Sequence, residues 1–375
     1  MIKQLIFEAP INNLSLGNVS LNILKSLYKK GIEVLYSPIG NPDISNFKLS
    51  DEFKLSLQNS ANRFLGEFNR KIPTLRSWHL SGSQSWCSDK RYLLTYHECD
   101  QATKQELNIC KNIDKVFFCG SYSPNIFKEY GADNIDTFNL GFDSDSFSKL
   151  NKTYFTDGRI NWGLFGKSEA RKASLKILSL WAKKYGKKQN ESYKAGEQQH
   201  FLSLCIHNPF YDTKIQEQQI AQALGGQRYI NIQFFPFLNQ DAYNDIYNMI
   251  DIDLTGLSLS ESWNLPAFNT TCLSKWSIVL NAHGHKTWAT KDNAILVNPS
   301  GKVKNVDNIF FFENSPFNVG NFYFWSDEDV SKAMDIAVTK AKTPNIEGEK
   351  LKETFSYDKT VDYVLGKIEE DLNKK

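Results

Sequence analysis

The chain has 375 residues, of which 41% are hydrophobic, and its 44 basic and 42 acidic residues leave a formal net charge of +2. This length predicts two domains of ordinary size, and the composition excludes a disordered or fibrous protein. The balanced charge excludes a strong overall field, so a nucleic acid or a membrane surface would have to be recognised by local residues.

The cellular location is indicated by the N-terminus and the cysteines. The first apolar run is interrupted by Glu8 and Pro10, too early for a secretory signal, and no stretch approaches the roughly 20 apolar residues of a membrane span. The six cysteines are scattered without a CxxC pair, which is typical of reduced packing residues. We therefore expect a cytoplasmic chain without a transmembrane segment.

The chain begins with a strand, helix, strand pattern. Residues 3–10 form a short apolar run, and apolar residues at helical spacing follow between Gly17 and Gly31. A second apolar run occupies 32–40. This order predicts a βαβ unit in which Gly17 lies in the loop between the first strand and its helix.

Residues 43–90 are less regular, and the alternation returns after them. Strand and helix patterns then follow one another at 91–97, 101–113, 114–120 and 123–131. Such alternation favours a doubly wound parallel sheet. The polar, aperiodic stretch 142–159 is typical of a linker between domains.

A second series of strands and helices follows this linker. Strands are expected at 159–166, 201–208, 229–237, 250–257, 275–284 and 293–299. Helices are expected at 167–186, 214–226, 239–249, 266–274 and 327–342. We therefore predict an N-terminal domain at 1–150, a C-terminal domain at 151–355, and a C-terminal helix at 356–375 that can cross back to the first domain. Open sheets of this type bind ligands at the carboxyl ends of their strands.

The first candidate site is FGKSEARKAS, which follows a predicted strand. Gly166 ends the strand, and Lys167, Arg171 and Lys172 cluster at the predicted start of the next helix. A helix N-terminus attracts anions, and cations placed there oppose the helix dipole unless an anion is bound. The motif therefore predicts a phosphate site. The alternative is that Arg171 and Lys172 belong to the solvated face of a lysine-rich helix.

The second candidate site is ESWNLPAFN, between a predicted strand and a helix whose first turn holds Pro266. The backbone N–H groups of Asn264 and Leu265 would be free at the helix entrance and suit a phosphate. Glu261 accepts hydrogen bonds only, which suits sugar hydroxyls, and Asn269 lies one turn into the helix. The alternative is a carboxylate that caps a helix N-terminus.

Two further motifs contain histidine. His283 and His285 lie in a glycine-containing loop without a carboxylate or cysteine at a supporting spacing, so we favour loop histidines and predict no metal site. His97 and Glu98 follow the predicted strand 91–97. They either serve as acid, base or substrate-binding groups or simply end the strand. The chain has no GxGxxG, P-loop or GxSxG motif.

Together these segments resemble the retaining, metal-independent glycosyltransferases of the GT-B fold, in particular the large family 4. LSLGNVSLNILKSLYKKGIEV resembles the glycine loop and first helix of the family. The stretch 106–147 resembles the end of its first domain, with Gly141, Phe142 and Asp143 in the place of the GVD signature. GKSEARK is similar to the donor-phosphate motif, and ESWNLPAFN to the Glu-x7-Glu element.

The resemblance implies an α/β fold of two Rossmann-like, doubly wound parallel-sheet domains that face an interdomain cleft. It implies that His97, Glu261 and Lys172 form the catalytic group. Lys167 and Lys172 would neutralise the donor diphosphate, and Glu261 would hold hydroxyls of the donor sugar. The donor-binding set is completed by Gly17, Gly166, Arg171, Asn264, Leu265 and Asn269, and the acceptor side by Trp78, His79 and Glu98.

Three positions depart from the family pattern. Lys167 stands where the family has arginine and keeps the charge without the forked geometry. Asn269 replaces the second acid, which holds the nucleotide ribose in the family, and Asn264 replaces a common glycine. Asn269 can still form a hydrogen bond with a ribose hydroxyl but carries no charge.

The family also implies the partners. The donor would be a UDP- or GDP-sugar, no metal ion or other cofactor would be needed, and the acceptor would be a glycan or another hydroxyl compound. Charge developing on the leaving nucleoside diphosphate would be met by Lys167, Lys172 and helix N-termini. Attack from the face that the leaving group departs from would retain the anomeric configuration.

Three alternatives remain open. The compact chain, rich in Asn, Lys and Phe, also resembles phage-encoded glycosyltransferases, some of which glucosylate modified bases in DNA. The basic stretch 167–194 and the loop residues Trp78 and Trp86 would then meet DNA in the host cytoplasm. The asparagine at 269 raises the alternative of a nucleotide-sugar-binding protein without catalysis. An epimerase of the same fold is the third alternative.

Overall fold

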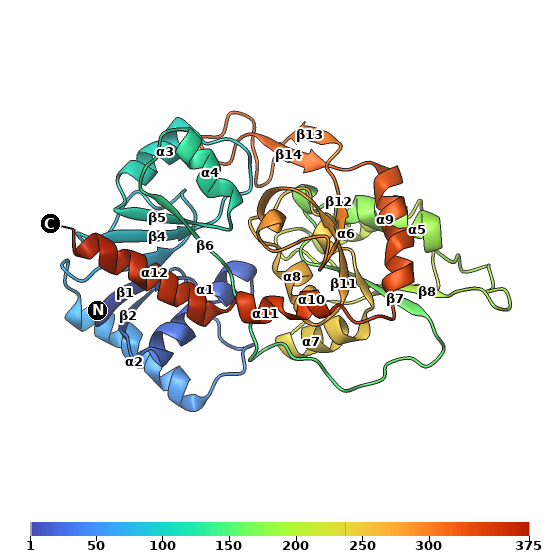
Figure 1. Ribbon diagram of the computed structural model, residues 1–375, viewed down its shortest axis with the longest axis horizontal. Coiled ribbons are helices and arrows are strands. Elements are labelled where there is room, and N and C mark those ends of the chain that lie inside the picture. The colour runs from blue at the N-terminus through green and yellow to red at the C-terminus, as the bar shows by residue number, and fades with distance from the viewer. Residues whose placement is uncertain (1, 237, 375) are drawn as a thin grey trace. The chain divides into compact units, whose positions relative to one another are not determined.

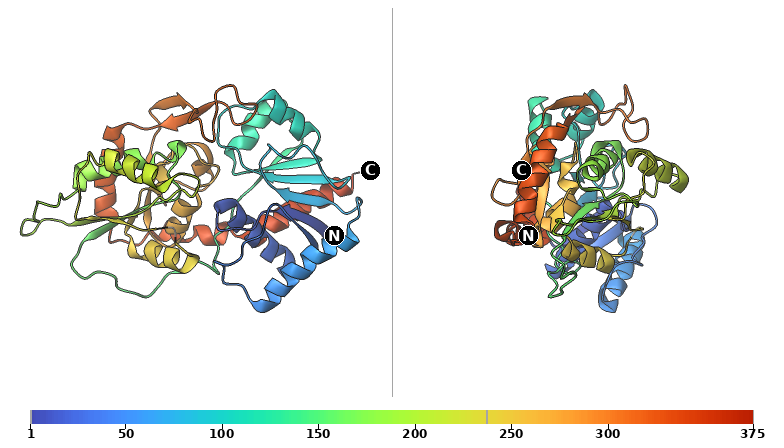
Figure 2. Two further views of the ribbon diagram at one scale, coloured as in Figure 1. Left: turned by 180° about the vertical axis from the view of Figure 1, so that it is seen from behind. Right: turned by 90° about the vertical axis from the view of Figure 1, so that its right-hand side faces the viewer.

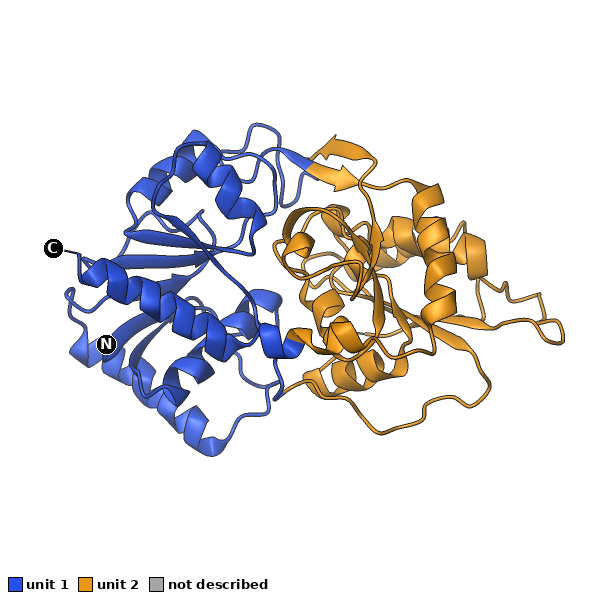
Figure 3. Ribbon diagram, in the orientation of Figure 1, with its two compact units in different colours: residues 1–145, 305–321, 352–375 blue, residues 146–304, 322–351 orange. Residues whose placement is uncertain are grey.

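The computed structural model describes residues 2–236 and 238–374. The chain divides into two compact units (Figure 3). Unit 1 consists of Met1–Asp145, Asn305–Asn321 and Lys352–Lys375, and unit 2 of Ser146–Lys304 and Phe322–Leu351. Each unit contains one six-stranded parallel sheet flanked by helices (Figure 1). The predicted α/β class is confirmed.

Unit 1 has the strand order β2-β1-β3-β4-β5-β6. Its strands are β1 (Gln4–Ala9), β2 (Glu33–Pro38), β3 (Thr74–Ser77), β4 (Arg91–Thr95), β5 (Lys115–Cys119) and β6 (Ile135–Phe138). Its helices are α1 (Ser15–Lys29), α2 (Asp51–Glu67), α3 (Lys104–Lys111), α4 (Tyr122–Glu129) and α12 (Tyr357–Leu372). α3 begins at a capping box, in which Thr103 and Glu106 satisfy each other's backbone N–H groups.

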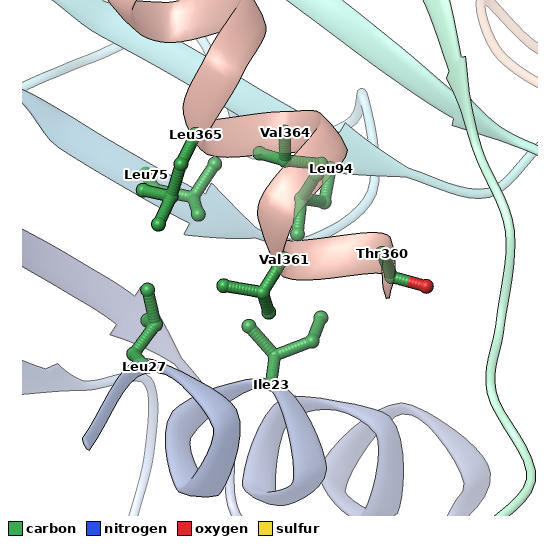
Figure 4. A pocket seen from close by; sticks show the side chains of 8 residues that line it. All are labelled: Ile23, Leu27, Leu75, Leu94, Thr360, Val361, Val364 and Leu365. Carbon is green, nitrogen blue, oxygen red and sulfur yellow. The ribbon is translucent and has the colours of Figure 1, made fainter. Parts of the chain in front are cut away.

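Helix α12 packs on unit 1 although it ends the chain. It lies beside α1 and covers strands β3 and β4, and Figure 4 shows Val361, Val364 and Leu365 meeting Ile23 and Leu75 there. Ser26 on α1 donates a hydrogen bond of 2.7 Å to Asp358. The apolar face of α12 is therefore part of the core of unit 1.

Unit 1 also includes residues 305–321, which the sequence analysis placed in the second domain. The backbone N–H of Asn318 donates to Glu106, and the hydroxyl of Thr103 donates to the carbonyl of Pro316, at 2.9 and 2.6 Å. Phe317 packs against the apolar cluster that contains Phe118. No sequence period marks this segment, because its contacts are with residues about 200 positions earlier in the chain.

Unit 2 has the strand order β12-β11-β10-β7-β8-β9. Its strands are β7 (Ile160–Phe165), β8 (His200–Cys205), β9 (Ile232–Phe234), β10 (Ile252–Asp253), β11 (Trp276–Leu280) and β12 (Ile295–Val297). Its helices are α5 (Ser174–Tyr185), α6 (Thr213–Ala223), α7 (Gln240–Met249), α8 (Leu265–Cys272), α9 (Asp327–Lys340) and α10 (Ile346–Glu349). The remaining elements are the 3₁₀ turns η1 (Ala170–Lys172), η2 (Thr255–Leu257) and η3 (His283–Thr287), the hairpin β13 (Gly301–Lys304) and β14 (Asn321–Phe324), and α11 (Leu351–Thr354), which begins where the chain returns to unit 1.

The strand order of unit 2 contains a topological switch point. The chain runs from β7 through β8 to β9 at one edge, and β10 then pairs with β7 on its other side. Loops that leave neighbouring strands in opposite directions open a crevice at the carboxyl ends of those strands. In unit 2 these are the loops that follow β7 and β10.

The core of unit 2 is built around buried tryptophans. Trp162 on β7, Trp181 on α5 and Trp325 before α9 are fully buried in one apolar cluster. α5 and α9 lie side by side over this cluster (Figures 1 and 2), and Lys184 on α5 donates to Ser331 on α9 at 2.8 Å. The side chain of Ser326 caps α9 by accepting from the backbone N–H of Asp329.

Several predicted boundaries differ from the structure. The predicted strand 229–237 forms only at β9, and its last residue, 237, lies outside the described residues. Gly17 lies in the first turn of α1 and not in the loop before it, because Asn12 accepts from the N–H of Leu14 and the helix begins at Ser15. Within the part of the chain that the structure describes, no helix is both long and apolar enough to cross a membrane.

Candidate functional site

Charged side chains from two loops meet at the switch point of unit 2. Lys167, Glu169, Arg171 and Lys172 lie in the loop after β7, and Glu261 lies in the loop after β10. The two loops are also joined by their backbones, since the N–H of Leu259 donates to the carbonyl of Arg171 at 2.7 Å. The fold therefore brings the two motifs singled out in the sequence into one site.

The five side chains form a continuous chain of ion pairs. Lys167 Nζ lies 3.0 Å from Glu169 Oε1, and Arg171 Nε lies 3.0 Å from Glu169 Oε2. Arg171 Nη1 lies 2.9 Å from Glu261 Oε2, and Lys172 Nζ lies 2.6 Å from Glu261 Oε1. Arg171 thus bridges the two carboxylates, and Lys172 forms an ion pair with the second.

Both carboxylates are ionised in spite of their burial. Burial raises the pKa of Glu261, but the charges of Arg171 and Lys172 outweigh it and hold that pKa well below its usual range. The pKa of Glu169 is lowered for the same reason. Burial raises it, but the positive charges of Arg171, Lys172 and Lys167 lower it by more. The site therefore holds three cations and two carboxylates at neutral pH.

The cations do not stand at a helix N-terminus, which corrects the sequence analysis. The predicted helix 167–186 begins only at Ser174. Before it lie the 3₁₀ turn η1 and Ala173, whose φ of 51° is left-handed and interrupts the helix. The ion pairs of Arg171 and Lys172 agree with this interruption, because both side chains reach Glu261, whereas a regular helix would point two consecutive side chains about 100° apart.

Gly166 has a backbone conformation that favours glycine. Its φ is +91°, and a Cβ atom there would lie 3.7 Å from Lys172 Nζ. Lys167 follows directly, and its ammonium lies 4.9 Å from the ring centre of Phe210. The strand end is therefore shaped so that the backbone turns sharply beside Lys172.

The backbone of Glu261 is held by the loop after β11. The N–H of Gly284 donates to the carbonyl of Glu261 at 3.0 Å, and His283 Nδ1 lies 3.2 Å from the N–H of Glu261. A Cβ atom at Gly284 would lie 2.5 Å from that carbonyl oxygen. Glycine is required here because the two loops approach each other so closely. Burial lowers the pKa of His283, so its imidazole is neutral.

Asn264 organises the start of α8. Its φ of 73° is left-handed, a conformation that asparagine tolerates better than most residues, which agrees with its standing where the resemblance places glycine. Its side chain donates to the carbonyl of Thr255 at 2.9 Å and to His285 Nε2 at 3.0 Å, and accepts from the N–H of Ala267. Because Nδ1 of His285 donates to the carbonyl of Leu280, both ring nitrogens of His285 are occupied.

The entrance of α8 keeps unsatisfied hydrogen-bonding groups. Among the described residues, none accepts from the backbone N–H groups of Asn264 and Leu265. Asn269, one turn into α8, is buried, and its Oδ1 has no partner in the described part of the chain. A buried oxygen without a donor is costly, so this position is suited to a ligand that donates a hydrogen bond.

His97 lies inside unit 1. Its ring packs edge-on against Phe127 at 5.0 Å between centres, and Nε2 lies 3.7 Å from Glu106 Oε1. Neither ring nitrogen has a hydrogen-bond partner among the residues that the structure describes. Burial lowers the pKa of His97 although Glu106 and Asp100 act to raise it. The imidazole is therefore neutral.

The other predicted residues of unit 1 have mixed surroundings. Trp78 is half-buried and packs with Trp86 on the apolar cluster of unit 1, His79 is exposed, and Glu98 is half-buried. Trp86 also lies under the guanidinium of Arg76, 4.1 Å from its ring centre. Gly17 is needed because a Cβ atom there would lie 2.3 Å from the backbone nitrogen of Asn12.

The basic stretch 167–194 is largely neutralised by acidic partners. Beyond the ion-pair chain, Lys176 pairs with Asp327, Lys184 with Asp335 and Lys187 with Glu197. Lys176 also lies 4.2 Å from the ring centre of Trp325. This stretch is therefore not a continuous basic surface of the kind that binds a phosphate backbone.

Two contributors to the site were missed in the sequence. Glu169 lies inside the GKSEARK motif but is not among the predicted site residues, although an acid two residues from both Lys167 and Arg171 signals ion pairs on a tight turn. His283 is predicted only as a loop histidine, because its contact with Glu261 depends on the pairing of β10 with β11. Among the described residues, no group of three or more His, Cys, Asp and Glu side chains is placed to hold a metal ion.

Comparison with known proteins adds evidence on the fold. No family model and no curated protein matches the sequence. Solved structures do match: a glycosyltransferase from Rickettsia africae is 12% identical and superposes over 100% of both chains with a TM-score of 0.65. A sucrose-phosphate synthase from Thermosynechococcus elongatus is 11% identical over 99% of both chains, with a TM-score of 0.64.

A third similar structure contains a nucleotide sugar. HepE from Anabaena in complex with UDP-glucose is 12% identical, covers 98% of this chain and 99% of its own, and has a TM-score of 0.60. The chain has the GT-B fold. The GT-B fold implied by the sequence motifs is thereby confirmed, and identities of 11–12% carry the likeness no further than the fold.

Proposed function

We propose that the chain is a glycosyltransferase, which moves a sugar from a nucleoside diphosphate sugar to an acceptor hydroxyl. The observation that carries the proposal is the pairing of Lys172 with Glu261 at the switch point of unit 2, 2.6 Å apart. A cation that can bind the diphosphate of the donor then lies next to a carboxylate that can accept hydrogen bonds from the hydroxyls of its sugar. HepE, a protein of the same fold, is known in complex with UDP-glucose.

The diphosphate of the donor would lie against Lys167, Arg171 and Lys172. Lys172 lies beside the sharp turn at Gly166, and the N–H groups of Asn264 and Leu265, for which no described residue is an acceptor, would supply further donors. A phosphate would then meet both charge and directed hydrogen bonds.

The two sugars of the donor would use the acceptor oxygens of the site. Glu261 is ionised and is held at its backbone by Gly284, so its position is fixed before the donor binds. It would accept hydrogen bonds from hydroxyls of the transferred sugar. The partnerless oxygen of Asn269 would accept from a ribose hydroxyl of a UDP or GDP group.

The reaction would depend on stabilising the leaving group. As the bond from the sugar to the diphosphate breaks, negative charge grows on the phosphate oxygens, and Lys167 and Lys172 would balance it without a metal ion. The acceptor hydroxyl would attack from the same face of the sugar, so that the configuration is retained. His97, Gly17 and the acceptor-side residues Trp78, His79 and Glu98 stay predictions from the family resemblance.

The acceptor would be a glycan or another hydroxyl compound. The acidic partners of the basic stretch 167–194 make a DNA acceptor the less favoured alternative. Retention of the chain on duplex DNA at low salt, lost as salt is raised, would favour DNA instead.

The donor is tested first by thermal unfolding with UDP- and GDP-sugars. A bound donor stabilises the folded chain by about 2.7 kcal/mol at a hundredfold excess over its dissociation constant. The donor that stabilises most is then used in hydrolysis and transfer assays on the wild type, Glu261→Ala, Lys172→Ala and the exposed control Lys183→Ala.

We expect the first two variants to lose most of their turnover and the control to keep it. Full activity in both Glu261→Ala and Lys172→Ala would contradict the catalytic assignment. Donor binding without any turnover would indicate a binding protein, and turnover of the donor sugar into its epimer without an acceptor would indicate an epimerase.

A further inference from the structure

The carboxylate of Glu169 forms ion pairs with two cations of the proposed donor site. Its two carboxylate oxygens each lie 3.0 Å from a cation, Oε1 from Lys167 and Oε2 from Arg171. The side chain is only 3% exposed. A carboxylate with one oxygen on each of two cations has the same arrangement as a bound phosphate that bridges them.

The positive charge of the site is too small to neutralise both Glu169 and the diphosphate of a donor. Three cations and two carboxylates leave a net charge of +1. The diphosphate of a nucleotide sugar carries about two negative charges, and the released nucleoside diphosphate about three, since the terminal phosphate ionises further near neutral pH. If Glu169 keeps its partners, the arriving diphosphate finds only one uncompensated positive charge.

The two carboxylates differ in the exposure of the cations that hold them. Both residues are held at their backbone carbonyls, Glu261 by the N–H of Gly284 and Glu169 by the N–H of Lys172. The carboxylate of Glu261 pairs with Arg171 and Lys172, which are 11% and 10% exposed, whereas that of Glu169 pairs with Arg171 and Lys167. Lys167 is the most exposed of the five side chains in these ion pairs, with 24% of its side chain accessible. Its ammonium group lies at the end of a flexible side chain. Lys167 is therefore the cation that can turn most easily from Glu169 to a ligand.

We infer that Glu169 is an internal counter-anion of the diphosphate site, which holds Lys167 and Arg171 in place without donor and competes with the diphosphate for them. This inference rests on the proposed function. Glu169 acts through the two cations and is a positioning residue. Its presence weakens the binding of donor and nucleotide product alike, so it speeds the release of the nucleoside diphosphate after transfer.

The test compares nucleotide affinity with and without the charge at 169. UDP, GDP and inorganic pyrophosphate are titrated calorimetrically into the wild type, Glu169→Gln and the control Glu217→Gln. Glu217 is an exposed residue of α6, so the control removes one negative charge outside the site. We expect Glu169→Gln to bind the tightest of these anions on the order of tenfold more tightly than the wild type, with no change in the control.

A double variant separates this role from a structural one. In a Lys167→Gln background, Glu169→Gln should tighten binding by much less, because one of the two cations that it releases is gone. Thermal unfolding identifies any variant that does not fold, and Glu169→Ala then takes the place of Glu169→Gln. Simple damage to the site weakens binding and cannot produce a gain.

The outcomes distinguish the inference from the proposed function. If the wild type binds nucleotide or pyrophosphate and removal of the Glu169 charge leaves the affinity unchanged or lowers it, Glu169 is a structural brace and the inference fails alone. If neither the wild type nor the variants bind any of the three anions, the proposed diphosphate site fails, and the inference fails with it.

Discussion

At the scale of single residues, the candidate site contains a buried oxygen to which no described residue donates a hydrogen bond. Asn269 Oδ1 is buried without a partner among the described residues. Leaving a buried acceptor unpaired costs about 1–3 kcal/mol. A bound ligand that donates a hydrogen bond to Asn269 Oδ1 would remove this cost.

We predict that Asn269→Leu raises the stability of the free chain by about 1 kcal/mol and weakens nucleotide binding. The leucine has nearly the same size and leaves no unsatisfied oxygen, but it cannot accept from ribose. Urea unfolding with and without nucleotide measures both effects. A loss of stability with unchanged nucleotide affinity would contradict the role given to Asn269.

Asn264 shows how much a single residue type can predict. The motif indicated a turn before a helix, and the structure has asparagine in a left-handed conformation that caps α8. The residue type could predict the cap, because asparagine favours both that conformation and that position. Its bond to His285 could not be predicted, since it depends on the loop after β11.

At the scale of elements, strand β10 carries a buried acid next to the site. Asp253 accepts from the N–H and the hydroxyl of Thr255 at 3.1 and 2.6 Å, and from the hydroxyl of Thr270 at 3.2 Å. Thr255 in turn accepts from the N–H of Phe165 at the end of β7. This network holds the ends of β7 and β10, from which the two loops of the site depart.

Burial raises the pKa of Asp253 to about 6 from its ordinary value of 3.8, and the hydrogen bonds only reduce that rise. Because the folded chain binds this proton more tightly than the unfolded chain, the contribution of Asp253 to stability is greatest below pH 3.8 and is lost as the pH rises through 6. The difference between the folded and unfolded pKa of Asp253 corresponds to a loss of about 3 kcal/mol in the free energy of unfolding.

We predict that the free energy of unfolding of Asp253→Asn, relative to that of the wild type, increases by about 2–3 kcal/mol as the pH rises from 4 to 7. Asparagine keeps an acceptor for Thr255 and cannot ionise. Urea unfolding of both proteins across this range measures the difference, and the exposed Asp292→Asn serves as the control. A difference that does not change with pH would contradict the raised pKa.

The elements themselves were largely predictable, and their ends at the site were not. Strand and helix periods located both sheets, since alternation of apolar residues reflects burial on one or two faces. The start of α5 was wrong by seven residues, from Lys167 to Ser174. Helix propensity favours a helix through GKSEARK, but the ion pairs to Glu169 and Glu261 impose a turn there.

At the scale of the whole molecule, unit 1 depends on chain segments from three separate parts of the sequence. Helix α12 contributes the buried residues Val361, Val364, Leu365 and Ile368 to its core. Burial of each such side chain contributes about 1.5–3 kcal/mol, so their sum is comparable to the 5–15 kcal/mol that stabilise a typical domain.

We predict that a chain ending at Ser356 loses the fold of unit 1 while unit 2 remains folded. Hydrogen exchange followed by peptide is the measurement, and peptides from β1 to β6 should lose their protection. A chain that ends at Leu372, the last residue of α12, is the control and should keep this protection. Full protection of unit 1 without α12 would contradict the account of its core.

The sequence by itself determined the class of the fold, the two sheets and the two motifs of the candidate site, because periodicity and turn residues are local properties. Tertiary structure alone decided that residues 305–321 join unit 1 and that Glu169 stands between Lys167 and Arg171. The physical reason is that an ion pair or a packed segment depends on distances across the fold. Those distances are fixed by the order of the strands, which no local pattern records.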